Sequence, residues 1–228
     1  MSLLFYFTYF AIGSCWASFW ITIGERCADP PLNSSPYSQC PICFCHLQAF
    51  QLIPITGWLC QRGKCIHCQQ AISVFSTIFE ILTGLLFGKS AVASSHDFIA
   101  ILFVSASLLV MAATDHTAQW INPIHTLPLA LLPTASTNIF IFAFWQRLVI
   151  AILFIIIGHY CHALGDGDFL FIAYLFICCG LYQTALTIMI ASGAALIVYG
   201  AKASSLTTRL PFIPWLAGAL MIVLFLTT

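Results

Sequence analysis

The sequence predicts an all-α polytopic membrane protein of about eight transmembrane helices with one polar, cysteine-rich loop. Of its 228 residues, 61% are hydrophobic and only 6% are charged, whereas about a quarter of a typical soluble domain is charged. Apolar stretches of roughly 17 to 25 residues recur along the chain, and a helix of that length crosses a hydrocarbon core of about 30 Å. In lipid, only helices and closed barrels pair all backbone N–H and C=O groups in hydrogen bonds. Barrel strands alternate apolar and polar residues, so continuous apolar runs favour helices.

The first expected element is a retained transmembrane helix over residues 1–23. It starts with the uncharged segment MSLLFYF, and no small-residue cleavage site follows a short apolar core. Both features argue against a removed signal peptide. Residues 24–71 follow as the extended extramembrane loop, which is rich in Pro, Cys and Gln.

Residues 72–228 are expected to form a bundle of transmembrane helices. The apolar stretches place these helices at 72–88, 98–114, 121–135, 144–163, 169–182, 183–200 and 211–227. Residues 136–147 remain open to a second interpretation, as an interfacial stretch.

The positions of the basic residues predict the orientation, because cytoplasmic loops retain Lys and Arg. If the first helix runs from outside to inside, five basic residues are cytoplasmic and only Lys89 and Arg147 are external. The five are Arg26, Arg62, Lys64, Lys202 and Arg209. The loop is then cytoplasmic, and Asp115 and Asp168 reach the same membrane level from different helices.

Four of the eleven cysteines form two C-x-x-C pairs in the loop, Cys40 with Cys43 and Cys65 with Cys68. Two such pairs supply four thiolates for a tetrahedral zinc ion, and four reduced cysteines without metal are the alternative. A closed four-cysteine site has no position for water, so its zinc would stabilise the loop and take no part in catalysis. The nearby residues that could replace one ligand are Cys45, His46, Cys60 and His67.

Carboxylates in membrane-associated sequence form the second group of candidates. Four of the seven acidic residues lie there: Glu80, Asp115, Asp166 and Asp168. A carboxylate at membrane depth costs free energy and therefore suggests a functional site. Two carboxylates that share a proton can activate water for attack on a peptide carbonyl. The alternative is that these side chains only cap helix ends.

Together these segments resemble the type IV prepilin peptidases, the G-x-G-D membrane aspartyl proteases that also serve type II secretion and competence pseudopili. Four segments carry the resemblance: Ala17-Ser18-Phe19 with Arg26; Ser38 to Glu80 with both cysteine pairs; Asp115 to Pro123 with the following Thr126-Leu127-Pro128-Leu129; and Gly165-Asp166-Gly167-Asp168. The resemblance implies that Asp115 and Asp168 are the catalytic aspartates and that Asp166 occupies a variable position.

The resemblance also implies a substrate and a second activity. The substrates would be prepilin or pseudopilin precursors, cut at the cytoplasmic face of the inner membrane after a glycine that ends a short basic leader. Many members then methylate the new N-terminus with S-adenosylmethionine. The compact loop and the Glu25-Arg26 pair are similar to enzymes of Gram-positive competence systems. Ile21, Leu170 and Asn122-Pro123 depart from the family pattern.

The composition and the two residue groups argue against one other class of function and leave two others open. Seven Lys and Arg balance seven Asp and Glu, so no basic surface indicates a nucleic-acid partner. A transporter would also place carboxylates in a helix bundle, but it would not require paired cysteines in a loop. A non-enzymatic zinc-loop scaffold for pilus assembly would keep the cysteines and have no need of Asp115 and Asp168.

Overall fold

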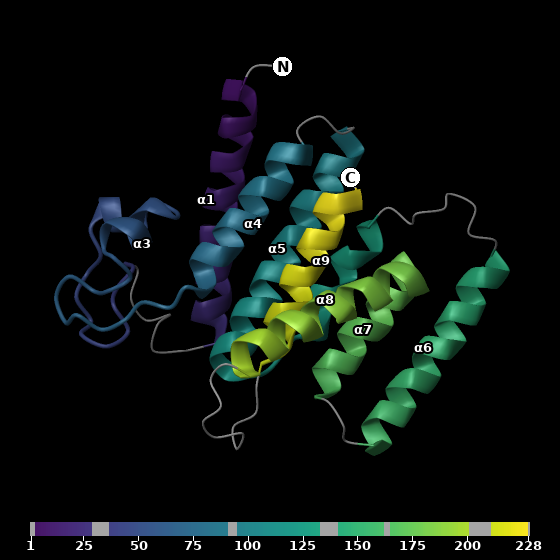
Figure 1. Cartoon of the computed structure of the whole chain (residues 1–228). Coiled ribbons are helices and arrows are strands. Elements are labelled where there is room, and N and C mark those ends of the chain that lie inside the picture. Colours follow the sequence, from purple (N-terminus) through teal and green to yellow (C-terminus); the bar gives the residue numbers. More distant parts are fainter. Residues whose placement is uncertain are drawn as a thin grey trace.

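The computed structural model describes residues 3–28, 37–90, 95–132, 141–161, 165–200 and 211–227. Within these ranges the chain forms helices, two isolated β-bridges and connecting turns (Figure 1). The helices are α1 (Leu3–Ala28), η1 (Ala49–Leu52), α3 (Thr56–Cys60), α4 (Phe75–Ser90), α5 (Ser95–Ala118), η2 (Pro123–Leu131), α6 (Ile141–Cys161), α7 (Asp166–Cys179), α8 (Leu181–Gly200) and α9 (Ile213–Thr227). The all-helical fold class predicted from the sequence is therefore confirmed.

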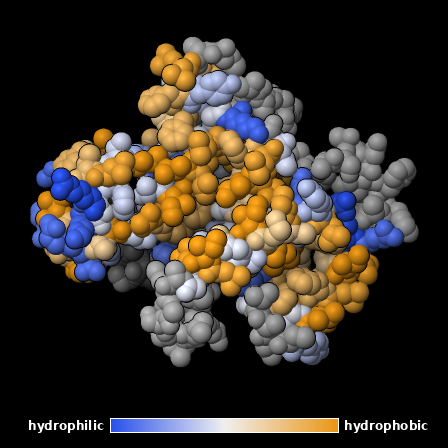
Figure 2. Space-filling view, viewed as in Figure 1, coloured by the Kyte–Doolittle hydropathy of each residue, from blue (hydrophilic) through white to orange (hydrophobic). Residues whose placement is uncertain are grey.

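Several of these helices have the length and composition of membrane spans. Among the described residues, 3–28, 98–118 and 181–200 are long and apolar enough to cross a membrane. Parts of α6, α7 and α9 form shorter apolar helices. Figure 2 shows hydrophobic side chains over the flanks of the bundle, as expected for a surface that faces lipid.

The helices α1, α4, α5 and α9 lie side by side and form the main bundle (Figure 1). Helix α5 lies at its centre, with Leu108, Leu109 and Met111 fully buried. On the other side, η2 packs against both α5 and α7, and α6 packs on α7. The loop with η1 and α3 lies beside α1 and α4, at the opposite side of the molecule from α6 (Figure 1).

Small residues let α1 approach α4 closely. A Cβ atom added at Gly13 of α1 would lie 2.8 Å from the Thr83 carbonyl oxygen of α4. A Cβ atom at Gly84 would lie 2.7 Å from the Ser14 Oγ of α1. Contacts of this kind drive helix association in membranes, where lipid chains are as apolar as the side chains and give no hydrophobic driving force.

The expected helix over 121–135 is wrong as a continuous transmembrane helix. In the described part of this range the chain forms η2, a 3₁₀ helix of nine residues, about 18 Å long at 2.0 Å per residue. The physical reason lies in Pro128, because a proline inside a helix cannot donate to the α-helical ladder and its ring clashes with the carbonyl group one turn earlier. Asn122 starts the element by accepting a hydrogen bond from the Ile124 N–H group. Residues 133–140 lie outside the described ranges.

The other seven expected helices are found, with ends that differ by a few residues. The helix expected over 1–23 is longer than expected and reaches Ala28. The helix expected over 144–163 starts earlier than expected, at Ile141. Residues 141–147 thus belong to α6 and not to an interfacial stretch. The break between α7 and α8 falls at Gly180, whose φ of +81° is a conformation that glycine adopts at no steric cost.

Candidate active site

Asp115 lies near the C-terminal end of α5, where it contacts the start of α9. The side chain is 8% exposed, and its Oδ2 accepts a hydrogen bond from the Ile213 N–H group at 3.2 Å. Ile213 is the first residue of α9, so the Asp115 carboxylate satisfies one of the backbone donors that a helix leaves unpaired at its N-terminus. Residues 98 positions apart in the sequence are joined by this bond.

Asp168 lies in the first turn of α7 and is half-buried. Its N–H group donates to the Gly165 carbonyl oxygen at 3.0 Å, and Gly165 is the extended N-cap residue of the helix. Gly167, between the two acidic positions, packs directly on Ile121, since a Cβ atom there would lie 2.5 Å from Ile121 Cδ1. Asp166 begins the helix, and its side chain lies outside the described part of the structure.

Asp115 and Asp168 come from α5 and α7, and the segment from Ile121 through η2 packs against both of these helices. The two aspartates thus lie at helix ends that share one neighbouring segment. Two carboxyl groups that approach each other closely can share one proton. This arrangement can hold one carboxyl group as an acid and the other as a base, which is the chemistry of a two-carboxylate hydrolase.

Glu80, the third described carboxylate of the predicted set, serves a different part of the molecule. It is 5% exposed, and its Oε2 accepts a hydrogen bond from the Ile55 N–H group at 2.7 Å. The Ser14 hydroxyl of α1 donates a hydrogen bond to the Glu80 carbonyl oxygen at 3.1 Å. Glu80 therefore ties the loop to α4 and α1. Sequence reasoning marked Glu80 only as a membrane carboxylate, because nothing in the pattern identifies Ile55 as its partner.

A stacked pair next to Asp115 was not predicted from the sequence. The imidazole of His116 lies flat on the ring of Phe75, with centroids 4.3 Å apart and planes at 1°. This contact joins the end of α5 to the start of α4. The only sequence signal was the position of His116 directly after the candidate aspartate.

The four predicted cysteines form one cluster in the loop. The sulfur atoms of Cys40, Cys43, Cys65 and Cys68 all lie within 4.8 Å of one another. The Cys40 and Cys68 sulfurs are 3.9 Å apart, as are those of Cys43 and Cys65. A tetrahedral zinc with Zn–S bonds of about 2.3 Å would hold its sulfurs about 3.8 Å apart. The cluster therefore fits a zinc ion in donor set and in size.

Each cysteine pair lies on a backbone turn of the same design. The N–H groups four residues after Cys40 and Cys65, those of Phe44 and Gln69, donate back to the carbonyl oxygens of these two cysteines. Phe44 and Gln69 have φ angles of 56° and 58°, an uncommon conformation for residues other than glycine. Two matching turns thus present two thiols each towards a common point.

Backbone contacts and neighbouring thiols make the thiols of the cluster unequal. Hydrogen bonds from the backbone of Cys68 and His67 lower the pKa of Cys65 to about 6. The Gln70 backbone acts in the same direction on Cys68, yet loss of hydration and the thiols of Cys65, Cys43 and Cys40 raise its pKa to about 11. Negative charge on one sulfur opposes ionisation of the next, which is the condition that a bound cation relieves.

None of the four alternative ligands belongs to a metal-sized group among the described residues. The ring of His46 packs against Tyr37, with centroids 5.4 Å apart. Cys45 contributes its carbonyl oxygen, which accepts a hydrogen bond from the Cys40 N–H group. Cys60 and His67 are exposed.

The chain is similar to membrane peptidases of one named family. Residues 11–94 match the model of the bacterial peptidase A24 N-terminal domain. A prepilin leader peptidase/N-methyltransferase of Stutzerimonas stutzeri is 31% identical over 203 residues, covering 81% of this chain and 70% of the relative. The enzyme of the same name from Bacillus subtilis is 37% identical over 112 residues, covering 46% of this chain and 44% of the relative.

A third relative of the same name, from Neisseria gonorrhoeae, is 38% identical over 99 residues, which are 42% of this chain and 35% of the relative. No solved structure matches the chain. The match to the S. stutzeri enzyme covers both α5 and α7 by its length, and the family model covers the cysteine loop. The chain belongs to the prepilin leader peptidase/N-methyltransferase family of membrane proteins.

Proposed function

We propose that this protein is a prepilin leader peptidase in which Asp115 and Asp168 are the catalytic residues. The observation that carries the proposal is that these two aspartates lie at the ends of separate helices, α5 and α7, that pack against the same segment, η2, of a membrane bundle. The names of the relatives support the same activity. A scaffold or a transporter has no comparable support.

In the proposed reaction the two carboxyl groups share one proton and bind a water molecule. The ionised carboxylate takes a proton from the water, whose oxygen attacks the carbonyl carbon of the scissile peptide bond. The protonated carboxyl group donates to the carbonyl oxygen and then, as the C–N bond breaks, a proton passes to the leaving amine. The Ile213 N–H group holds Oδ2 of Asp115, so its Oδ1 is the atom oriented towards water in this scheme.

The proposed substrates are precursors of type IV pilins or pseudopilins, cleaved between a short leader and the hydrophobic helix that follows.

The enzyme would lie in the inner membrane with the Asp115 end of the bundle facing the cytoplasm. The distribution of charge supports this orientation: Arg26 lies in the last turn of α1 and is followed in the loop by Arg62 and Lys64. Lys89 alone lies in the last turn of the neighbouring α4, which runs the opposite way in Figure 1. Lys202 and Arg209 lie outside the described residues.

The cysteine cluster is proposed to bind one structural zinc ion through Cys40, Cys43, Cys65 and Cys68. These residues would form a closed tetrahedral shell, and the bound metal would supply the folding free energy that a short loop cannot obtain from a core of its own. Metal analysis of the purified protein is expected to find about one zinc per chain. A stable and active protein without metal would contradict this assignment.

Methylation of the new N-terminus with S-adenosylmethionine is a second proposed activity, favoured by the name that the relatives carry. Among the described residues, no contact or cavity identifies where the methyl donor binds. Mass spectrometry of the processed pilin N-terminus reports cleavage and methylation in the same measurement.

The first prediction separates the two aspartates from their neighbour. With a candidate prepilin co-expressed, Asp115→Asn and Asp168→Asn are each expected to lower cleavage at least about 100-fold, the usual contribution of a general acid or base. Asp166→Asn is the matched control, two positions from Asp168 in the same turn, and it should retain most activity. Normal cleavage by the folded Asp168→Asn protein would refute the assignment.

A further inference from the structure

The loop segment that contains η1 and α3 has its polarity reversed with respect to a water-soluble loop. Gln51 is buried, with 8% of its surface exposed, whereas its neighbours Phe50, Leu52 and Ile53 are 43%, 46% and 53% exposed. Leu59 on α3 is 57% exposed. Soluble proteins expose isolated apolar side chains but rarely a contiguous group around a buried amide.

The amide groups in this segment satisfy one another. Oε1 of Gln51 accepts a hydrogen bond from the Gln48 N–H group at 2.7 Å, and Nε2 of Gln51 donates to Gln61 Oε1 at 2.9 Å. Nε2 of Gln61 in turn donates to the Gly57 carbonyl oxygen at 2.9 Å. Internal pairing of this kind is what a segment needs where water is not available to its polar groups.

The segment lies against the flank of the bundle and not beyond its end. Its Ile55 N–H group bonds to the Glu80 carboxylate, and the Glu80 carbonyl oxygen accepts a hydrogen bond from the Ser14 hydroxyl of α1 at 3.1 Å. Ser14 precedes Gly24 by ten residues, about 15 Å along α1 at 1.5 Å per residue. Gly24 packs on Ala113, two residues before Asp115, because a Cβ atom at Gly24 would lie 2.7 Å from Ala113 Cβ. The segment is therefore deeper in the bundle than Asp115.

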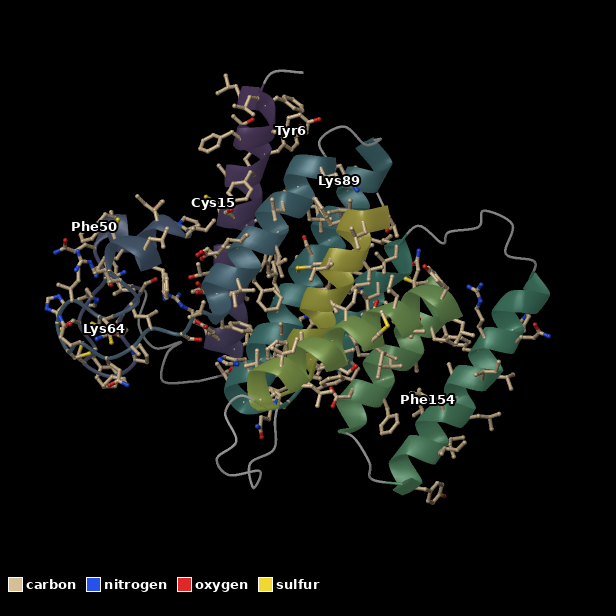
Figure 3. The ribbon with its side chains drawn as sticks, viewed as in Figure 1. Tyr6, Cys15, Phe50, Lys64, Lys89 and Phe154 are labelled. Carbon is tan, nitrogen blue, oxygen red and sulfur yellow. The ribbon has the colours of Figure 1, made fainter. Side chains whose placement is uncertain are left out.

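The side-chain view agrees with this depth. In Figure 3, Phe50 lies near the level of Cys15, halfway along α1, whereas Lys64 lies lower, towards the end of α1 that leads into the loop. Figure 2 shows the hydrophilic residues of the loop gathered at its edge farthest from the bundle. Phe50 thus lies beside the middle of α1, at a depth that lipid surrounds in a membrane bundle.

We propose that the segment 48–60 is a lipid-inserted element and that the membrane's own acyl chains cover Phe50, Leu52, Ile53 and Leu59. The exposed cations of the loop, Arg62 and Lys64, lie at the water-facing edge, where they meet phosphate headgroups. One side of the loop therefore lies among the acyl chains, and the cysteine cluster on its other side lies outside the acyl region. This inference concerns the loop surface and does not depend on the identity of the catalytic residues.

The test uses the full chain in phospholipid nanodiscs with a photoreactive residue at single positions. Phe50→p-benzoylphenylalanine is compared with Lys64→p-benzoylphenylalanine, and Ile53→p-benzoylphenylalanine serves as a second inserted position if the first variant folds poorly. After irradiation, mass spectrometry of the loop peptides is expected to find at least ten times more phospholipid adduct at position 50 or 53 than at position 64.

Three results would overturn the proposal. Equal lipid adduct at positions 50 and 64, or none at 50 and 53, would place the apolar side chains outside the acyl region. Adducts to a second copy of the chain would identify a dimer contact instead. Adducts that form only when a prepilin is present, and join to it, would identify a substrate-docking surface.

Discussion

The carboxyl group of Asp115 has a structural contact in addition to its proposed chemistry. Its Oδ2 accepts the Ile213 N–H group at the first residue of α9. A helix N-terminus carries partial positive charge and unpaired N–H groups, so an acidic side chain there stabilises the helix. The contact fits the interpretation of the membrane carboxylates as helix caps, and the proposed catalytic role of the same residue is compatible with it.

The two tasks of Asp115 can be separated by size-matched and truncating substitutions. Asp115→Asn keeps a carbonyl oxygen that can accept from Ile213, whereas Asp115→Ala removes it, and loss of a helix cap costs about 1 kcal/mol. We therefore expect both variants to lose cleavage and only the Ala variant to unfold at a clearly lower temperature in detergent. Equal unfolding temperatures for Asn and Ala would show that the contact does not stabilise α9.

At the scale of elements, the close packing of α1 on α4 depends on glycine. Gly13 faces α4 with no room for a Cβ atom, whereas a Cβ atom at Gly193 of α8 would meet nothing within 4 Å. The two glycines are both inside long helices, so their helix propensities are alike. They differ only in their surroundings.

Substitution of each glycine by alanine measures how much the close packing contributes to the free energy of unfolding. Gly13→Ala is expected to lower the free energy of unfolding by about 1 to 3 kcal/mol, because the new methyl group forces α1 and α4 apart. Gly193→Ala should leave stability unchanged or raise it by up to about 1 kcal/mol, since alanine is the better helix former. Thermal unfolding of both variants in the same detergent provides the comparison. A similar loss in both would mean that backbone freedom, and not contact, sets the effect.

At the scale of the whole molecule, the cysteine cluster and the two aspartates occupy separate regions. The cluster lies in the loop beside α1 and α4, whereas Asp115 lies where α5 contacts α9 and Asp168 lies at the start of α7, on the other side of η2. A four-thiolate zinc offers no open position for water. Damage to the loop should therefore act on stability or methylation before it acts on the hydrolytic step.

Cys65→Ser tests this separation. The variant is expected to lose metal and to give less folded protein, yet to cleave prepilin at a rate within a few-fold of the parent when the two are compared at equal folded concentration. Asp115→Asn, compared in the same way, should keep its metal and lose cleavage. If the folded Cys65→Ser protein loses all cleavage, the loop is part of the peptidase site.

The sequence predicted those features that depend on local pattern. Apolar runs located seven of the helices, and the C-x-x-C spacing identified the four cysteines that the structure gathers into one cluster. It failed at 121–135, where hydropathy is high but Pro128, inside the range, prevents a continuous α-helix. Proline was visible in the sequence, and its effect on the backbone should have outweighed the apolar composition.

Contacts between distant residues could not be predicted in the same way. The bonds from Ile55 to Glu80 and from Ile213 to Asp115 depend on how helices pack, and a backbone N–H group has no signature in the sequence. The same holds for the stacking of His116 on Phe75. The assignment of Asp115 and Asp168 as catalytic residues remains a prediction until their substitution is tested.

The bond between Ile213 and Asp115 has a consequence for biogenesis. A ribosome delivers α5 and α7 to the membrane before α9, so a nascent chain already carries both aspartates while the N–H group that orients Asp115 has not yet been synthesised. The pair acquires its described geometry only when α9 inserts beside α5. The proposed active site therefore takes its described form only after one of the latest segments of the chain is in place.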